Sequence, residues 1–326
     1  MEQGGLELSD LPAVCLECSL PDDECRQNGD GMTKIREFWN KPEHIAYLFI
    51  APALLLLLVF SILPLVASLV ISTFDANMTL SNVKFIGLGN FTEAFHDSRF
   101  WNSMWVTVKW TLVEMPVQVL VALFLAALIV KNTMFNKICR GVYFLPIICS
   151  ATAVAIMWRM ILHSNVGYIP FLLRQLGFGK VSFMNNPGVT FYVIVFMSVW
   201  KSFGISTIIL VAAMQNVPRE LYEAAELDHA GKFRQFIAIT LPGIAPSLWY
   251  VVMTRVIGSL QVFDIVYTTT GGGPNFSTET LVTYVYTRAF EVNRMGYATA
   301  VSECLFALIL VITILLYSRM LKQESD

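Results

Sequence analysis

Apolar positions in this chain are gathered into six long runs separated by polar connections. Each run is close to the ~20 residues with which an α-helix crosses the hydrocarbon of a bilayer. None alternates at every second residue, as the strands of an outer-membrane barrel do. Because lipid offers no partner to backbone N–H and C=O groups, the pattern predicts an all-α polytopic membrane protein with six transmembrane helices. The predicted helices cover residues 46–71, 104–130, 142–162, 189–213, 237–266 and 298–317.

Lys and Arg residues in the connections predict the orientation of these helices. They concentrate before the first run, after the second, around residues 214–236 and after the sixth, whereas the alternate connections are poorer in them. Short loops rich in Lys and Arg stay on the cytoplasmic side. We therefore expect both termini and the segment 214–236 to be cytoplasmic.

Composition gives the same class of protein. The 326 residues are 56% hydrophobic and 14% charged, with a mean hydropathy of +0.61. Soluble domains carry about 25% charged residues, so a soluble globular protein is excluded. The net charge of −2 says nothing about nucleic acid, but there is no basic stripe to follow a phosphate backbone, so we expect no nucleic acid partner.

The first 31 residues differ from the rest, with eight acidic residues, one basic residue and no apolar run. Cys15, Cys18 and Cys25 have a spacing that a zinc or iron–sulfur site uses, but no fourth ligand lies nearby. We expect residues 1–31 to be a disordered extension, with a metal site as the alternative. Met32 is a possible second start, and residues 32–326 then form the six-span domain.

One polar segment, between the fourth and fifth runs, has the pattern of a well-formed helix. Pro218 suits a first helical position, and Gly231 suits a stop. Leu221, Ala224 and Ala225 follow at i, i+3 and i+4 and give the helix a narrow face of small apolar residues. Such a face favours docking into the groove of a partner protein. An ordinary surface helix is the alternative.

Charged residues inside the apolar runs are costly, and they mark either functional sites or structural pairs. Lys109 and Glu114 lie five residues apart in the second run, close enough to approach one another. Arg255 shares one face of the fifth run with small and polar residues. We expect these to line a polar cavity together with residues of the fourth run, and pairing inside the bundle is the alternative. The cavity residues are Lys201, Ser202, Arg255, Gly258, Ser259 and Val262.

The polar helix carries a recognisable motif. The letters EAA at residues 223–225, followed by I-x-L-P at 239–242, resemble the EAA loop of binding-protein-dependent ABC importer permeases. In that family the loop is cytoplasmic, and its helix docks into a cleft on the ATPase subunit. The coupling residues that the resemblance implies are Glu223, Ala224, Ala225, Asp228, Gly231 and Pro242.

One position departs from the pattern of that loop. The Gly of the family falls on His229, and Gly231 follows two residues later. Because His adopts a positive φ far less readily than Gly, we expect Gly231 to take over the bend.

The region after the fifth run resembles the carbohydrate branch of these permeases. The series VFDIVY at 262–267, TGGGP at 270–274, YVY at 284–286, AF at 289–290 and GYA at 296–298 is typical of the first permease in the maltose and glycerol-phosphate type. The resemblance runs from about residue 46 onward and implies the type I ABC importer permease fold. It also implies that the polar cavity of the fifth span lies on the substrate pathway. The residues implied for binding-protein docking are Gly271, Gly272, Gly273 and Pro274.

The same resemblance implies a set of partners. They are a second permease subunit in a heterodimer, a dimer of ATPase subunits, an extracytoplasmic solute-binding protein, a sugar or sugar-like substrate and the surrounding membrane lipid. The location implied is the bacterial plasma (inner) membrane.

A nucleotide site is missing from the sequence. A P-loop needs G-x-x-x-x-G-K-[ST], but residues 179–181 read GKV and residues 231–233 read GKF. We therefore expect no enzyme activity and no cofactor, with ATP and Mg bound by the partner ATPase. One alternative is an ion-coupled secondary transporter in which Glu114, Glu303 or Lys109 carries a proton. The other is a non-transporting scaffold that binds an ATPase, for which ATP hydrolysis would move no solute.

Overall fold

The computed structural model describes residues 42–79, 81 and 83–325. Cys15, Cys18 and Cys25 lie outside the described residues. The structure therefore does not bear on the two alternatives for residues 1–31, a disordered extension or a metal site. The longer helices are α2 Pro42–Leu57, α5 Ser98–Ile129, α6 Met134–Ile148, α9 Pro187–Gln215, α13 Ala245–Leu260 and α16 Met295–Ser325. The shorter ones are α3 Leu63–Ile71, α4 Gly89–His96, α7 Ala151–Ile161, α8 Tyr168–Gln175, α10 Arg219–Leu227, α11 Lys232–Gln235, α12 Leu241–Gly243, α14 Asp264–Thr270 and α15 Leu281–Tyr286. Three π-helical turns, η1 Leu58–Ile62, η2 Phe236–Thr240 and η3 Thr287–Glu291, and a small antiparallel pair, β1 Phe74–Asp75 with β2 Lys84–Phe85, complete them.

Two compact units divide the chain at residues 66 and 67. In the first unit, α2 and η1 form an apolar helical segment whose described side chains are all exposed. A helix that is apolar on all sides and buries none of them suits a lipid environment. The second unit holds all elements from β1 onward, and the sites described below lie within it.

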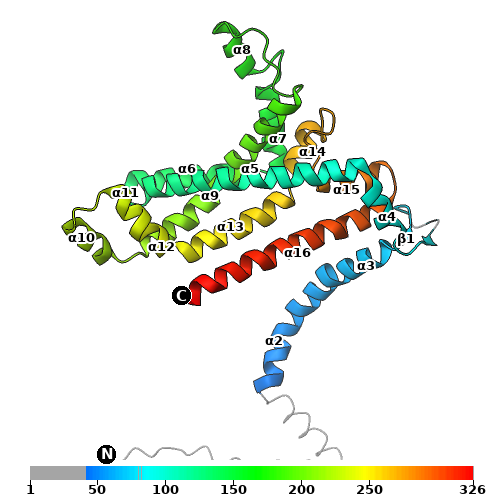
Figure 1. Cartoon of the computed structure of the whole chain (residues 1–326), viewed down its shortest axis with the longest axis horizontal. Coiled ribbons are helices and arrows are strands. Elements are labelled where there is room, and N and C mark those ends of the chain that lie inside the picture. Colours follow the sequence, from blue (N-terminus) through cyan, green and yellow to red (C-terminus); the bar gives the residue numbers. More distant parts are fainter. Residues whose placement is uncertain (1–41, 80, 82, 326) are drawn as a thin grey trace, which may run out of the picture. The chain divides into compact units, whose positions relative to one another are not determined.

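Helices α5 and α9 form the centre of the second unit and run in the same direction (Figure 1). Three hydrogen bonds join them or their ends, at sequence offsets of 84, 84 and 85 residues. A constant offset means that both helices advance together, so they are parallel. Trp110 of α5 packs edge-on against Phe191 of α9, with ring centroids 5.9 Å apart, and both side chains are buried.

Parallel helices bring like ends together, which defines two ends of this unit. At the α15 end, the third turn of α5 contacts the first residue of α15, because Leu281 N donates to Thr107 Oγ1 at 2.8 Å. At the α10 end, Gln215 Nε2 donates to the carbonyl of Val130 at 2.8 Å. Helices α10 to α12 follow directly from that end of α9.

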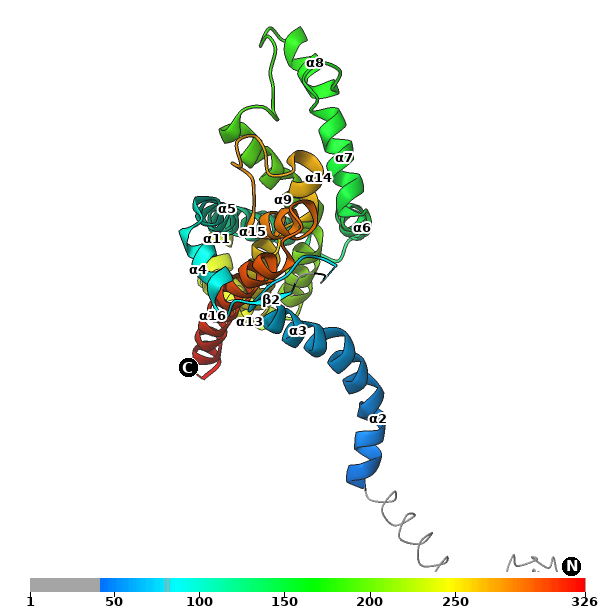
Figure 2. The same ribbon diagram turned by 90° about the vertical axis from the view of Figure 1, so that its right-hand side faces the viewer.

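The course of α5 and α9 bears on the number of spans. Among the residues that the structure describes, five helical segments are long and apolar enough to cross a membrane, and α6 with α7 makes a sixth if that bent pair counts as one. The bend between α6 and α7 is 94°, visible where α7 turns upward in Figure 2. Because α5 and α9 are parallel, the chain between them must return from the α10 end to the α15 end. The bent pair makes this return, which agrees with the six predicted spans.

Two predicted spans are less regular than the sequence pattern indicated. The third run was expected as one helix, but it breaks at Cys149–Ser150, where the Ser150 side chain caps α7 by accepting from Ala153 N. The fifth run was expected from residue 237, but the long apolar segment starts at Ala245, after η2 and the short α12. Proline explains the second difference, because Pro242 and Pro246 lack the N–H group that a continuous helix needs.

Close backbone contact fixes α6 against α9. A Cβ atom added to Gly204 of α9 would collide with the backbone carbonyl of Tyr143 of α6. Any larger residue at this position would force the two helices apart. Tyr143 also packs edge-on against Phe203, with ring centroids 5.6 Å apart. A small residue inside an apolar run is therefore a packing requirement here.

Candidate functional site

Side chains from α5, α9 and α13 meet at one buried carboxylate in the interior of the second unit. Arg255 Nη2 of α13 donates to Glu114 Oε1 of α5 at 2.9 Å, and Ser198 Oγ of α9 donates to the same oxygen at 3.3 Å. One turn further, Ser202 Oγ donates to Gln118 Oε1 at 3.3 Å. Glu114 is fully buried, whereas 18% of the Arg255 side chain is exposed. We refer to these five residues as the interior polar cluster.

The interior polar cluster has hydrogen-bonding capacity to spare. Within the described part of the chain, three of its buried atoms have no partner: Glu114 Oε2, Gln118 Nε2 and Arg255 Nε. Buried polar groups are normally paired, and each exception requires an explanation. An acceptor and two donors left free in one place suit water or a hydroxylated ligand, which can both donate and accept.

Helical spacing explains why these side chains meet. Glu114 and Gln118 are four residues apart on α5, and Ser198 and Ser202 are four residues apart on α9. Residues at i and i+4 lie one above the other on one helix face. Since the two helices are parallel, the two pairs face each other in register. Gln118 and Ser198 were not among the predicted residues, although polar residues at i, i+4 within an apolar run were the signal that would have found them.

The predicted cavity residues fall into two groups. Ser202 and Arg255 belong to the interior polar cluster, whereas Lys201 is half-buried and forms no ion pair or hydrogen bond with any described residue. Ser259 is buried, and its hydroxyl donates to the carbonyl of Val256 in its own helix at 2.9 Å. Gly258 is exposed, and a Cβ added there would meet no atom within 4 Å. Half-buried Val262 accepts a hydrogen bond from Thr280 Oγ1 at 3.0 Å through its carbonyl.

Lys109 and Glu114, which the sequence spacing allowed to approach one another, do not pair. Lys109 Nζ lies 4.4 Å from the centre of the Phe191 ring, and Glu114 pairs with Arg255 instead. Five residues is a poor spacing for a contact on one helix, because i+5 lies well round from position i. A cation over an aromatic face is attracted by the negative electrostatic potential that the ring quadrupole gives to that face.

Helix α10 is attached on one side and open on the other. Tyr222 OH hydrogen-bonds Thr240 Oγ1 of η2 over 2.8 Å, and the Tyr222 ring joins the apolar core between α5 and α9. Glu223 and Ala224 are exposed, as is Leu227, which is 83% accessible. The helix therefore presents a face with a carboxylate and small or apolar groups away from the bundle. Of the other predicted coupling residues, Ala225 is half-buried, whereas Asp228, Gly231 and Pro242 are exposed.

The expectation that Gly231 takes over the bend after α10 is wrong. His229 itself has a φ of 53°, whereas Gly231 has a φ of −64° and begins α11. Ala230 N donates to Ala225 O at 2.9 Å, and His229 N donates to Glu226 O at 3.0 Å. These two bonds form a Schellman motif, in which the residue after the C-cap is left-handed. The hydrogen bonds hold His229 in the left-handed conformation, which Gly adopts without steric cost.

The glycine-rich loop is bound to the bundle through Glu279, five residues after Pro274. Gly272 has a φ of 94°, and a Cβ there would lie 3.0 Å from Glu279 Cβ. Glu279 is fully buried, and Arg99 of α5 donates to it twice, at 2.6 Å and 2.9 Å. Gly272 is buried, and Gly273 and Pro274 are half-buried, so the exposed part of the loop is Gly271 with Asn275 and Phe276.

Glu279 and Arg99 were not predicted from the sequence. Both lie just beyond the runs and motifs that carried the predictions, in a connection and at a helix start. The ion pair between Glu279 and Arg99 could not be predicted, because it joins residues 180 positions apart in the sequence. Among residues 42–79, 81 and 83–325, no group of three or more His, Cys, Asp or Glu could hold a metal ion.

Comparisons with known proteins give the class of this molecule. Residues 118–320 match the family model "Binding-protein-dependent transport system inner membrane component". The chain is 33% identical over 282 residues to the sulfoquinovosyl glycerol transport system permease protein SmoG of Agrobacterium fabrum, covering 86% of this chain and 91% of that protein. It is 32% identical over 270 residues to the trehalose/maltose transport system permease protein MalF of Thermococcus litoralis, covering 83% and 91%.

A solved structure shows the same fold. It is a chain of a bacterial ABC transporter involved in the import of the acidic polysaccharide alginate, with a TM-score of 0.75 and 22% identity, covering 89% of this chain and 98% of that one. The fold is therefore that of an ABC importer permease, the type I fold that the sequence resemblance implied.

The chain belongs to the family of binding-protein-dependent transport system inner membrane components. It is a multi-pass membrane protein and a permease subunit of an ABC importer, as the EAA motif predicted, and this excludes both sequence-based alternatives, the secondary transporter and the scaffold.

Proposed function

We propose that this permease forms half of the translocation pathway for a sugar or sugar-like solute. Relatives that cover most of the chain are named for sugars or sugar derivatives, among them trehalose/maltose, arabinooligosaccharides and sn-glycerol-3-phosphate. The second half of the pathway is a second permease subunit, which makes the transporter a heterodimer in the membrane. The chain binds no cofactor, and ATP and Mg are bound by a partner ATPase.

The interior polar cluster is the observation that carries this proposal. Glu114, Gln118 and Arg255 have free acceptor and donor atoms in one place. A sugar hydroxyl donates and accepts at once, so one hydroxylated solute can satisfy all three kinds of free atom. Gly258, one turn beyond Arg255, leaves open space beside the same helix. The cluster lies between three spans, where a pathway through the bundle would pass.

Coupling to the ATPase dimer takes place at α10. The exposed face with Glu223 and Ala224 supplies a carboxylate and room for close approach, the combination that a helix docking into a groove requires. On the opposite side of α10, Tyr222 is hydrogen-bonded to Thr240, which directly precedes α12 and α13. Movement of α10 by the ATPase is thereby transmitted to α13 and its Arg255.

The orientation follows from this assignment. The α10 end and both termini lie in the cytoplasm of a bacterial cell, and the α15 end faces outward. An extracytoplasmic solute-binding protein docks at the outward end, on the loop with residues 271–274 and its exposed neighbours Asn275 and Phe276. The opposite positions of α10 and the glycine-rich loop at the two ends of α13 support this arrangement.

Uptake by the complete transporter tests the proposal. The chain is reconstituted in vesicles with its second permease, ATPase and binding protein, and uptake of labelled maltose, trehalose and sn-glycerol 3-phosphate is measured with and without ATP. Glu223→Ala and Ala224→Trp are each expected to abolish ATP-driven uptake while the protein still inserts. Glu226→Ala, an equal loss of charge nearer the attached side of α10, is the matched control. Normal uptake by both α10 variants would contradict the coupling role.

A further inference from the structure

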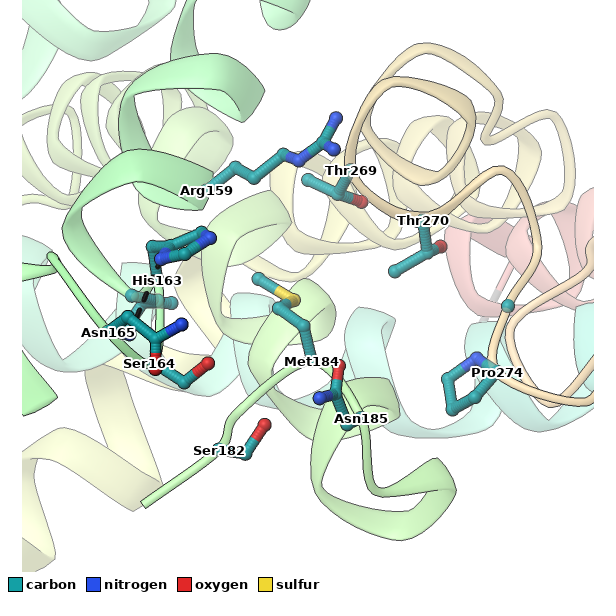
Figure 3. Close-up of a pocket in the computed structure, with 12 residues that line it drawn as sticks. Arg159, His163, Ser164, Asn165, Ser182, Met184, Asn185, Thr269, Thr270 and Pro274 are labelled. Atoms are coloured by element: carbon teal, nitrogen blue, oxygen red, sulfur yellow. Dashed lines mark hydrogen bonds between the residues drawn. The ribbon is translucent and has the colours of Figure 1, made fainter. Parts of the chain in front are cut away.

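A polar cavity lies at the α15 end, apart from the interior polar cluster. Its volume is about 420 Å³, and it is lined by the end of α7, the segment after it, the segment before α9, the end of α14 and the glycine-rich loop. Figure 3 shows the side chains that these segments contribute. Those on which the inference depends are Arg159, Asn165, Ser182 and Asn185. The volume is within the ~300–1,000 Å³ of small-molecule sites.

Among the described residues that line this cavity there is a cation and no carboxylate. Arg159 and His163 are the ionisable ones, and none of those described is an Asp or a Glu. Within the described residues, Arg159 forms no ion pair and no hydrogen bond. This differs from Arg255, whose charge Glu114 neutralises. The guanidinium of Arg159 therefore retains its N–H donors for a molecule that enters the cavity.

Neutral donors and acceptors surround that cation. The side chains of Asn165, Ser182 and Asn185 form no hydrogen bond with any other described residue. Thr270 is different, because its hydroxyl is already hydrogen-bonded to the Thr278 hydroxyl and to the carbonyl of Val266 in α14. Amide and hydroxyl groups pair well with sugar hydroxyls, and a guanidinium pairs with a carboxylate, sulfonate or phosphate through two parallel bonds.

We propose that this cavity is a solute subsite for an acidic sugar, in which Arg159 binds the anionic group and the Asn and Ser side chains bind hydroxyls. The inference rests on the proposed function, from which it takes the statement that the solute is a sugar. It adds that this sugar is negatively charged. A solute entering from the α15 end would reach this cavity before the interior polar cluster. The cavity lies beside the start of α9 and the end of α14, whereas Ser198 of the cluster lies further along α9.

Direct binding tests the inference independently of uptake. The purified complex of this chain with its second permease and ATPase is titrated with D-glucuronate and with D-glucose, which share a ring and differ in the carboxylate. Saturation-transfer NMR reports binding in each case. We expect the wild-type complex to bind glucuronate at least tenfold more tightly than glucose, and Arg159→Gln to remove that preference while binding of glucose changes less than twofold.

Lys180→Gln is the matched control, because Lys180 is an exposed cation in the segment before α9 and does not line the cavity. It should leave both affinities unchanged, and a thermal unfolding curve checks that Arg159→Gln is folded. Equal binding of both sugars by the wild type, or equal losses of both in Arg159→Gln, would overturn the proposal. So would weaker docking of the ligand-free binding protein to Arg159→Gln with glucuronate binding intact, which would make Arg159 a protein contact. If the complete wild-type transporter shows no ATP-driven uptake of any labelled solute while glucuronate still binds, the proposed function fails instead.

Discussion

Two buried Glu–Arg pairs in this permease look alike in composition but differ in how completely they are satisfied. At the α15 end, Glu279 receives three donors: Arg99 bonds both carboxylate oxygens, and Ser103 Oγ bonds one of them at 3.1 Å. In the interior polar cluster, both donors to Glu114 bond one oxygen, and the other has no partner in the described part of the chain. Both carboxylates are fully buried.

Under the proposed function, the difference separates a structural pair from a pair that contacts the solute. A buried carboxylate is tolerated when both of its oxygens are hydrogen-bonded and its charge is paired, and the pair then holds two segments in one geometry. Glu279 does this for the glycine-rich loop, because Gly272 packs directly against it. Glu114 keeps a free oxygen at a fixed position, a costly arrangement unless water or a solute occupies it. Mutations should therefore affect stability at one pair and transport at the other.

The largest effect is expected from Arg99→Ala, which leaves Glu279 buried without its cation. Breaking a buried pair in this way costs about 3–5 kcal/mol of the free energy of unfolding. Denaturant titration of the detergent-solubilised protein, followed by helical circular dichroism, measures the loss. Arg294→Ala is the control, since its pair with Glu93 is 36% and 48% exposed and should contribute about 0–1 kcal/mol. Equal losses in the two variants would contradict the structural role of Glu279.

The same substitution at both carboxylates sharpens the comparison. In Glu279→Gln the new NH₂ group must face a guanidinium N–H whichever way the amide turns, because Arg99 bonds both oxygens. We expect a loss of about 1.5–3 kcal/mol in unfolding free energy. In Glu114→Gln the NH₂ group takes the position of the unpartnered oxygen, and the loss should be about 1 kcal/mol.

Transport should show the reverse order. Glu114→Gln should reduce kcat/KM for uptake about tenfold, because one charged acceptor for solute hydroxyls is lost, and tenfold corresponds to about 1.4 kcal/mol. Glu279→Gln should lower uptake only in proportion to the folded protein that remains in the membrane. If Glu114→Gln proves the less stable variant and transports normally, the two roles have been assigned the wrong way round.

Arg255→Lys tests the geometry of the cation rather than its charge. Lys keeps a positive charge near Glu114 but lacks the planar fork and the free Nε of Arg255. We expect unfolding free energy to fall by about 1 kcal/mol and the choice between solutes to change several-fold. Competition between maltose and sn-glycerol 3-phosphate in the uptake assay measures that choice. An unchanged preference would mean that Arg255 acts only as the counter-ion of Glu114.

The sequence was informative where the physics is local. Apolar runs predicted the membrane spans, because a run long enough to cross the bilayer has few other uses. The EAA motif located α10, where Glu223 and Ala224 are exposed. Arg255 and Ser202 were expected inside the bundle because polar residues within spans face its interior, and both belong to the interior polar cluster.

What the sequence could not predict depends on pairing across the chain. Glu114 joins Arg255 across 141 positions, and Arg99 joins Glu279 across 180, so no local pattern signals either bond. The left-handed conformation of His229 was missed for a related reason: residue preference favoured Gly231, but the two hydrogen bonds that end α10 fall on His229 and Ala230. The break between α6 and α7 was missed because both halves are apolar.

The smallest effect is expected at the surface of the α15 end, where Asp97 precedes α5. Burial by itself raises the pKa of this carboxyl, but hydrogen bonds from Tyr284 OH, Arg99 N and Tyr297 OH, with the charge of Arg288, outweigh it and hold the pKa below the ordinary 3.8. A carboxyl with a lowered pKa stabilises the fold above its unfolded pKa, and this contribution is lost as the pH falls through the folded pKa. The thermal midpoint of the wild type should therefore exceed that of Asp97→Asn at about pH 6, and the gap should close below about pH 4. A gap that persists at low pH would show that Asp97 acts through its shape as a helix cap and not through its charge.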